Sequence, residues 1–227
     1  MCSQSELVAL CTQLWNENTE LHRQHHEDQH RLERIQQLEQ LMHLGDQLTL
    51  KKCYARVIKR EVSAWWDQFV INKGSADGIG ENDLVVAATF PTSSNMLPEI
   101  SVIGKVASVQ EHYATVILTT SPKFHLAVTL ESARNPTPMI FHGGQSFSPK
   151  NPMERLGRVT NVPTSLKTIK PGTAIIPISL QKEVASLALG TVLSLEPQGD
   201  GFFLQATVVL PSMSNIHEVT VIQTHDL

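Results

Sequence analysis

Histidine side chains cluster near the N-terminus, where His22, His25, His26 and His30 lie within nine residues. On a helix, the first, third and fourth of these imidazoles would share one face at i, i+4 and i+8 spacing, an arrangement that can chelate a metal ion. A single helix seldom supplies the further groups that orient metal ligands. We therefore predict no metal and no other cofactor, and interpret this face as ordinary solvated surface. A coil whose imidazoles repel one another once they are protonated below about pH 6.5 ranks ahead of a metal site.

The residues that could act as nucleophiles lack the partners that catalysis requires. Ser75 lies in KGSADG, which is typical of a turn, and no G-x-S-x-G elbow is present. His142 to Gly144 resemble an oxyanion loop, but without an elbow serine we assign them to a connector between domains. Cys53 with a distant histidine such as His112 could form a thiol enzyme, yet Cys53 opens a strand-like run and is expected to pack as a small apolar side chain. The sequence thus predicts a protein that is not an enzyme, with a double-β-barrel hydrolase of the serine-protease type as the alternative.

Charge and composition argue against several other classes of protein. The net charge of -4 offers no basic surface for nucleic acid. The three cysteines have no C-x-x-C spacing, which argues against a disulfide framework and a zinc site. No run approaches the roughly 18 uninterrupted apolar residues of a membrane-spanning helix. Membrane attachment is therefore expected only through an anchor outside this sequence, and a soluble coiled-coil adaptor is a further alternative.

The histidines lie on an element that reads as one long helix. Residues 1–50 contain eight acidic residues, a single glycine and no proline. Apolar residues recur every seven positions, as in a coiled coil. The predicted self-association residues are Leu7, Leu14, Leu21, Ile35 and Met42 on one seam position, and Leu10 and Leu38 on the other. A helix of this length needs its apolar stripe buried, so we predict a homodimer or higher homo-oligomer; the alternative is a helix folded back on its own β region.

The rest of the chain has the pattern of a β protein. All twelve prolines and eleven of the twelve glycines follow Lys51, where short β-branched runs alternate with turn residues. A Pro-, Gly- and Ser-rich stretch from Glu131 to Glu154 is taken as a boundary. The predicted fold is mainly β with a long N-terminal helix: a coiled coil over residues 1–50, a first small β-barrel over 51–132 and a second over 133–227, with strands that could interleave.

One stretch of this β region resembles a known family. The run ARVIKREVSAWWDQFVINKGSADGIGENDLVV, from Ala55 to Val86, resembles the segment that follows the coiled coil in the rod shape-determining MreC family. VIGKVASVQEHYATVILTTSPKF is similar to the next segment of that family. The fingerprint positions, to which we assign structural roles, are Arg60, Trp65, Phe69, Lys73, Gly74, Asp77, Gly78 and Gly104. Trp65 is expected to pack over the first barrel, and its neighbour Trp66, if exposed, is a candidate partner contact.

The resemblance implies a scaffold rather than a catalyst. It implies a bacterial inner-membrane protein whose barrels lie on the extracytoplasmic, periplasmic side and serve cell-wall elongation or division. The partners that it implies are a class B penicillin-binding transpeptidase, MreD and the MreB system. Self-association would raise the affinity for such partners by making each second contact intramolecular.

Overall fold

The computed structural model describes part of the N-terminal segment and most of the β region. The described residues are 15, 18, 19, 22, 23, 51–89, 99–131, 137–148, 151, 154–166, 169–180, 187–198, 202–213 and 215–224. The chain divides into two compact units, Met1–Glu39 and Gln40–Leu227. In the first unit, the five described residues are helical and exposed, and the Thr19 hydroxyl donates to the Trp15 carbonyl over 2.8 Å. The predicted seam, from Leu7 to Met42, lies outside the described residues.

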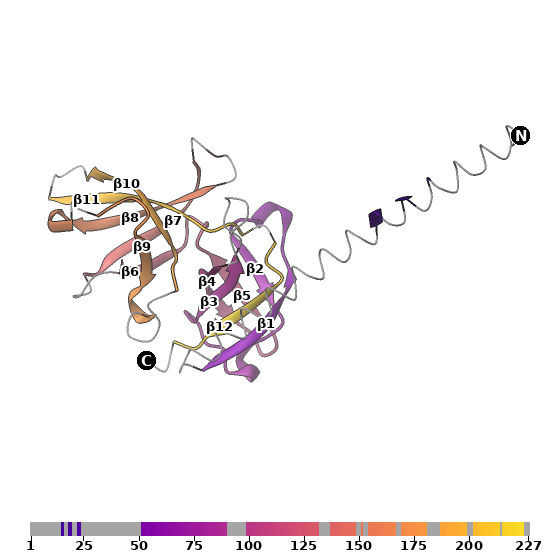
Figure 1. The fold of residues 1–227 in the computed structure, drawn as a ribbon. Coiled ribbons are helices and arrows are strands. Elements are labelled where there is room, and N and C mark those ends of the chain that lie inside the picture. The colour runs from indigo at the N-terminus through magenta and orange to yellow at the C-terminus, as the bar shows by residue number, and fades with distance from the viewer. Residues whose placement is uncertain are drawn as a thin grey trace, which may run out of the picture. The chain divides into compact units, whose positions relative to one another are not determined.

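The second unit consists of two closed barrels of six strands each. The first barrel has the order β1-β12-β3-β4-β5-β2 and the second the order β10-β11-β8-β7-β6-β9 (Figure 1). The strands of the first barrel are β1 (Lys52–Lys59), β2 (Gln68–Ile71), β3 (Leu84–Thr89), β4 (Glu99–Val109), β5 (Ala114–Leu118) and β12 (Glu218–Ile222). Those of the second are β6 (His125–Leu130), β7 (Met139–Phe147), β8 (Arg155–Pro163), β9 (Ala174–Pro177), β10 (Gly190–Pro197) and β11 (Phe203–Val209). Short 3-10 helices cover Val62–Ala64, Ser75–Asp77, Thr164–Leu166 and Ile178–Leu180.

The barrels do not follow the boundary drawn from the sequence at residues 132 and 133. β6 precedes that boundary but pairs with β7 and β9 of the second barrel. β12 follows it but closes the first barrel between β1 and β3, and its yellow arrow lies among purple strands in Figure 1. Without β12, two strands of the first barrel would expose unpaired edges. The predicted connector from Glu131 to Glu154 is also wrong in part, because β7 runs through it and carries His142 to Gly144.

One apolar core extends from the second barrel to the wall of the first. β3 is buried on both faces: Val85 and Ala87 face the interior of the first barrel, whereas Leu84 and Val86 belong to the cluster that holds the core of the second barrel. Near this contact the Val102 amide donates to the carbonyl of Ala188 over 2.9 Å. Buried apolar surface that is continuous between two barrels ties them into one body.

Within the part of the chain that the structure describes, no helix is both long enough and apolar enough to cross a lipid bilayer.

Candidate functional site

The fingerprint segment around Lys73 forms a packed turn. The Lys73 ammonium lies 2.6 Å from the Asp77 carboxylate, whose second oxygen accepts a 3.2 Å hydrogen bond from the Gly74 amide. The hydrogen bond from Lys73 lowers the pKa of Asp77. Gly78 follows with φ of 80°, in the left-handed region that glycine adopts without strain. Ser75 begins the short 3-10 helix, and its amide donates to the Gln110 carbonyl, so the turn is held against the β4–β5 hairpin.

The remaining fingerprint residues also serve the first barrel. Phe69 is fully buried in its core. A side chain at Gly104 would overlap the backbone of Ile117 on the neighbouring strand β5. These two positions allow close packing between strands and within the barrel.

Cys53 has the wrong electrostatics for a catalytic thiol. Burial raises the pKa of its thiol, and the negative charge of Asp77 raises it further. A raised pKa keeps the sulfur protonated, whereas a nucleophilic cysteine needs its thiolate. His112, the base considered from the sequence, is exposed and lies 3.8 Å from Glu111. The structure therefore gives no support to the thiol-enzyme alternative.

Arginines and aromatic rings connect the two barrels, and we call Arg60, Trp65, Trp66, Phe147 and Arg155 the arginine–aromatic cluster. The Arg60 guanidinium lies 4.3 Å from the centre of the Trp65 ring and donates 2.9 Å hydrogen bonds to the carbonyls of Trp65 and Met213. The Arg155 guanidinium, on the second barrel, lies 4.2 Å from the Trp66 ring and 3.9 Å from that of Phe147. Such cation–π contacts attract guanidinium groups to ring faces, so Trp66 contacts the second barrel.

Trp65 is more exposed than Trp66, the reverse of what the sequence suggested. Trp66 is half-buried against the core of the first barrel, and its carbonyl accepts a hydrogen bond from the Thr120 hydroxyl. Trp65 is 37% exposed and Phe147 is 54% exposed. The cluster thus presents Trp65 and Phe147 to solvent, and Trp66 joins the barrels.

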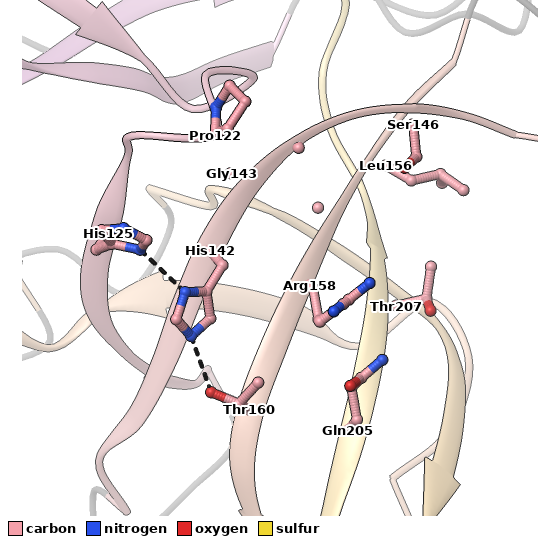
Figure 2. A pocket seen from close by; sticks show the side chains of 12 residues that line it. Pro122, His125, His142, Gly143, Ser146, Leu156, Arg158, Thr160, Gln205 and Thr207 are labelled. Carbon is pink, nitrogen blue, oxygen red and sulfur yellow. Dashed lines mark hydrogen bonds between the residues drawn. The ribbon is translucent and has the colours of Figure 1, made fainter. Parts of the chain in front are cut away.

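A polar pocket lies on the outer wall of the second barrel. Four side chains stand directly opposite one another on adjacent strands: His125 on β6 pairs with His142 on β7, His142 with Arg158 on β8, and Arg158 with Thr207 on β11. We call these four residues the polar row. They line a pocket of about 530 Å³. Figure 2 shows His142 between His125 and Thr160, with Arg158 on the neighbouring strand.

The two histidines of the row share a hydrogen bond. Their Nδ1 atoms are 2.9 Å apart, and Nε2 of His142 lies 3.0 Å from the Thr160 hydroxyl. One imidazole must donate and the other accept, so this bond requires that at least one ring be neutral. Burial lowers the pKa of His142, and the charges of His125 and Arg158 lower it further.

Stability should therefore depend on pH through His142. The pKa of His142 is lower in the folded than in the unfolded chain. The stability linked to this residue is therefore fully present above about pH 6.5 and is lost as the pH falls through the folded-state pKa. We expect His142→Gln to reduce the loss of unfolding free energy between about pH 7.5 and pH 5.5, measured by urea denaturation. His112→Gln, at an exposed hairpin, is the control. An identical pH dependence in the wild type and His142→Gln would contradict the prediction.

The polar row was not anticipated from the sequence. Its members are separated by 17, 16 and 49 residues along the chain, and only His142 drew attention, as part of a supposed connector. Most fingerprint residues, in contrast, lie in the packed turn or at packing positions of the first barrel, and Arg60 and Trp65 lie in the arginine–aromatic cluster.

The family of this chain follows from a match over most of its β region. A family model described as "Rod shape-determining protein MreC, barrel core" matches residues 57–223. The chain belongs to the MreC family. The match includes the arginine–aromatic cluster, the packed turn and the polar row, and it ends one residue after the last strand of the closed barrels. The resemblance read from the sequence is thus confirmed.

Solved MreC structures share the fold. MreC of Listeria monocytogenes is 23% identical, with 97% of this chain and 93% of that chain covered and a TM-score of 0.60. A second structure, named MreC, is 19% identical and covers 85% and 98% of the two chains with a TM-score of 0.64. The major periplasmic domain from the cell shape-determining filament MreC is 20% identical, covering 77% and 96%, with a TM-score of 0.57. No curated protein sequence matches this chain significantly.

Proposed function

We propose that this MreC-family chain is a non-enzymatic scaffold that maintains bacterial cell shape by holding peptidoglycan-synthesis proteins together. The observation that carries the proposal is the family match over residues 57–223, which covers both barrels. The family is a shape-determining one, and this agrees with a protein that binds rather than catalyses. No observation favours the hydrolase or the cytoplasmic-adaptor alternative.

The physical basis is a stiff double barrel with several outward faces. The shared apolar core and the arginine–aromatic cluster hold the barrels together, so a partner on one barrel keeps its orientation relative to a partner on the other. Preorganised surfaces lose less conformational entropy on binding than flexible ones. The exposed rings of Trp65 and Phe147 are candidate anchors on one such face.

We propose as partners a class B penicillin-binding transpeptidase, MreD and the MreB system, on the extracytoplasmic side of the inner membrane. The support is membership of the MreC family. Self-association through Leu7, Leu14, Leu21, Ile35 and Met42, with Leu10 and Leu38, would place two double barrels on one assembly. Each second contact with a paired partner then becomes intramolecular, which raises the apparent affinity.

Three measurements test the proposal. Light scattering of the full chain should give at least twice the 25.2 kDa mass of one copy, and a chain that starts at Lys51 should be monomeric. A purified transpeptidase ectodomain should bind both, with weaker apparent affinity for the monomeric form when the ectodomain is immobilised at high density. A full chain that is also monomeric would reject the coiled-coil part. If no cell-wall synthesis protein binds and a serine-reactive fluorophosphonate labels the chain specifically, the scaffold proposal is rejected.

A further inference from the structure

We propose that the polar row of the second barrel is a binding site for a carboxylate side chain on an acidic peptide segment of a protein partner. The site consists of His125, His142, Arg158 and Thr207, aligned across four adjacent strands. The inference extends the proposed scaffold function, because it gives the chemistry of one segment that the scaffold would hold.

The charges of the pocket favour an anion. The residues that line it include one arginine and two histidines and no aspartate or glutamate. Within the described part of the chain, no carboxylate forms an ion pair with Arg158. On the side of β4, the Lys105 ammonium lies 3.2 Å from the His125 carbonyl oxygen, and β11 contributes the neutral side chains Gln205 and Thr207. The charged and titratable side chains that line the pocket are therefore all basic; Glu196 on β10 stands opposite Gln205 but is not one of the lining residues.

The donor geometry fits a single carboxylate. The guanidinium of Arg158 presents a planar fork of N–H groups that matches the two oxygens of a carboxylate. At neutral pH it is the one fixed charge among the lining residues, which balances a monoanion better than the nearly doubly charged phosphate group. The shared hydrogen bond and the contact with Thr160 hold the His142 ring in one orientation beside this fork.

The shape of the wall suits a peptide rather than a free small anion. Between His142 and Ser146 the pairing of β7 with β8 is irregular, and this bulge lies beside the row. The pocket of about 530 Å³ is within the range that holds a side chain together with part of its backbone. Ser146, Thr160 and Gln205 line the same pocket and can exchange hydrogen bonds with peptide groups.

The site should bind more tightly as the pH falls. A proton taken up by the histidine pair adds a second positive charge beside Arg158, whereas a glutamate side chain stays ionised down to about pH 4.3. Protonation of the pair is therefore the change near the row that alters the attraction for a carboxylate.

The test uses the full chain and a fluorescein-labelled, terminally blocked five-residue peptide with one central glutamate, beside its glutamine counterpart. In fluorescence polarisation at low salt, we expect the glutamate peptide to bind about 10-fold more tightly than the glutamine peptide, and more tightly at pH 5.5 than at pH 8.0. Arg158→Gln should weaken binding of the glutamate peptide about 10-fold. Arg158→Lys should weaken it less, because lysine keeps the positive charge but lacks the planar fork of N–H groups. Arg56→Gln, an exposed arginine paired with Glu218 on the first barrel, is the matched control and should bind as the wild type does.

Several results would overturn the inference. Equal binding of the two peptides would exclude carboxylate recognition, and equal losses in Arg158→Gln and Arg56→Gln would show general charge attraction. Stronger competition by inorganic phosphate than by acetate at equal ionic strength would assign the pocket to a different ligand. None of these results alters the binding of a transpeptidase ectodomain to the rest of the scaffold, so the two proposals can fail separately.

Discussion

Replacing Phe141 by alanine should lower the free energy of unfolding by about 3–5 kcal/mol, the usual cost of emptying a fully buried phenylalanine site. The Phe141 ring is 0% exposed and meets Phe124 edge to face, with ring centres 5.9 Å apart. Gly157 leaves room for this ring, since a side chain there would lie 2.5 Å from two of its atoms. Neighbouring groups that are this tightly packed cannot collapse fully into the cavity.

The same variant tests whether the two barrels unfold together. Phe141 lies in the second barrel, but its core cluster includes Leu84, Val86 and Val102 from the first. We expect one shifted transition in urea, seen equally by circular dichroism and by the fluorescence of Trp65 and Trp66. Phe202→Ala, at a 77% exposed ring, is the control and should change stability by less than about 0.5 kcal/mol. A tryptophan transition that keeps its wild-type midpoint would show that the barrels unfold independently.

Replacing Gly74 by alanine should destabilise the chain by about 3 kcal/mol, at the upper end of the cost of overpacking. A methyl group at Gly74 would overlap the carbonyl oxygen of Gln110 and lie 2.6 Å from that of Glu111. Both are backbone atoms, so no side-chain rotation can relieve the overlap. The hairpin between β4 and β5 would have to separate from the turn, with loss of the hydrogen bond from the Ser75 amide to the Gln110 carbonyl. Chemical denaturation measures the loss.

Gly172→Ala separates this overlap from backbone strain. Gly172 has φ of 88°, but a side chain there would meet nothing within 4 Å. Its replacement should cost only the strain of a left-handed conformation, about 1–2 kcal/mol. A loss in Gly74→Ala no greater than that in Gly172→Ala would mean that the turn and hairpin can move apart at little cost. The fingerprint glycine would then be less important for packing than its contacts indicate.

Much of the barrel architecture could be predicted because strands carry a local signal. Burial alternates along β5 and along β11, as expected for strands with one face in a core. The turn at Lys73 to Gly78 was also readable, since glycine, aspartate and serine favour tight turns for local reasons. The MreC resemblance depended on the same turn and on the spacing of Arg60, Trp65 and Phe69, all within one stretch of chain.

The boundary between the barrels could not be predicted in the same way. β12 has the same local pattern whether it closes the first barrel or the second. Its place between β1 and β3 depends on strands more than 100 residues earlier in the chain. β7 was missed because the bulge around Gly143 and Gly144 interrupts the alternation of apolar residues. A pattern that depends on a period of two residues fails where the strand itself departs from that period.

The sequence alone therefore determined that the chain after Lys51 is a β protein and that Lys73 to Gly78 form a turn, because both follow from neighbours along the chain. The two barrels were expected from the MreC resemblance, and the turn packs against the distant β4–β5 hairpin. Only the tertiary structure decided that Trp66 joins the barrels while Trp65 faces solvent. The tertiary structure alone also aligned His125, His142, Arg158 and Thr207 in one row. The physical reason is that register between strands is set by the packing of distant segments, and a shift of one residue would turn each of these side chains to the opposite face.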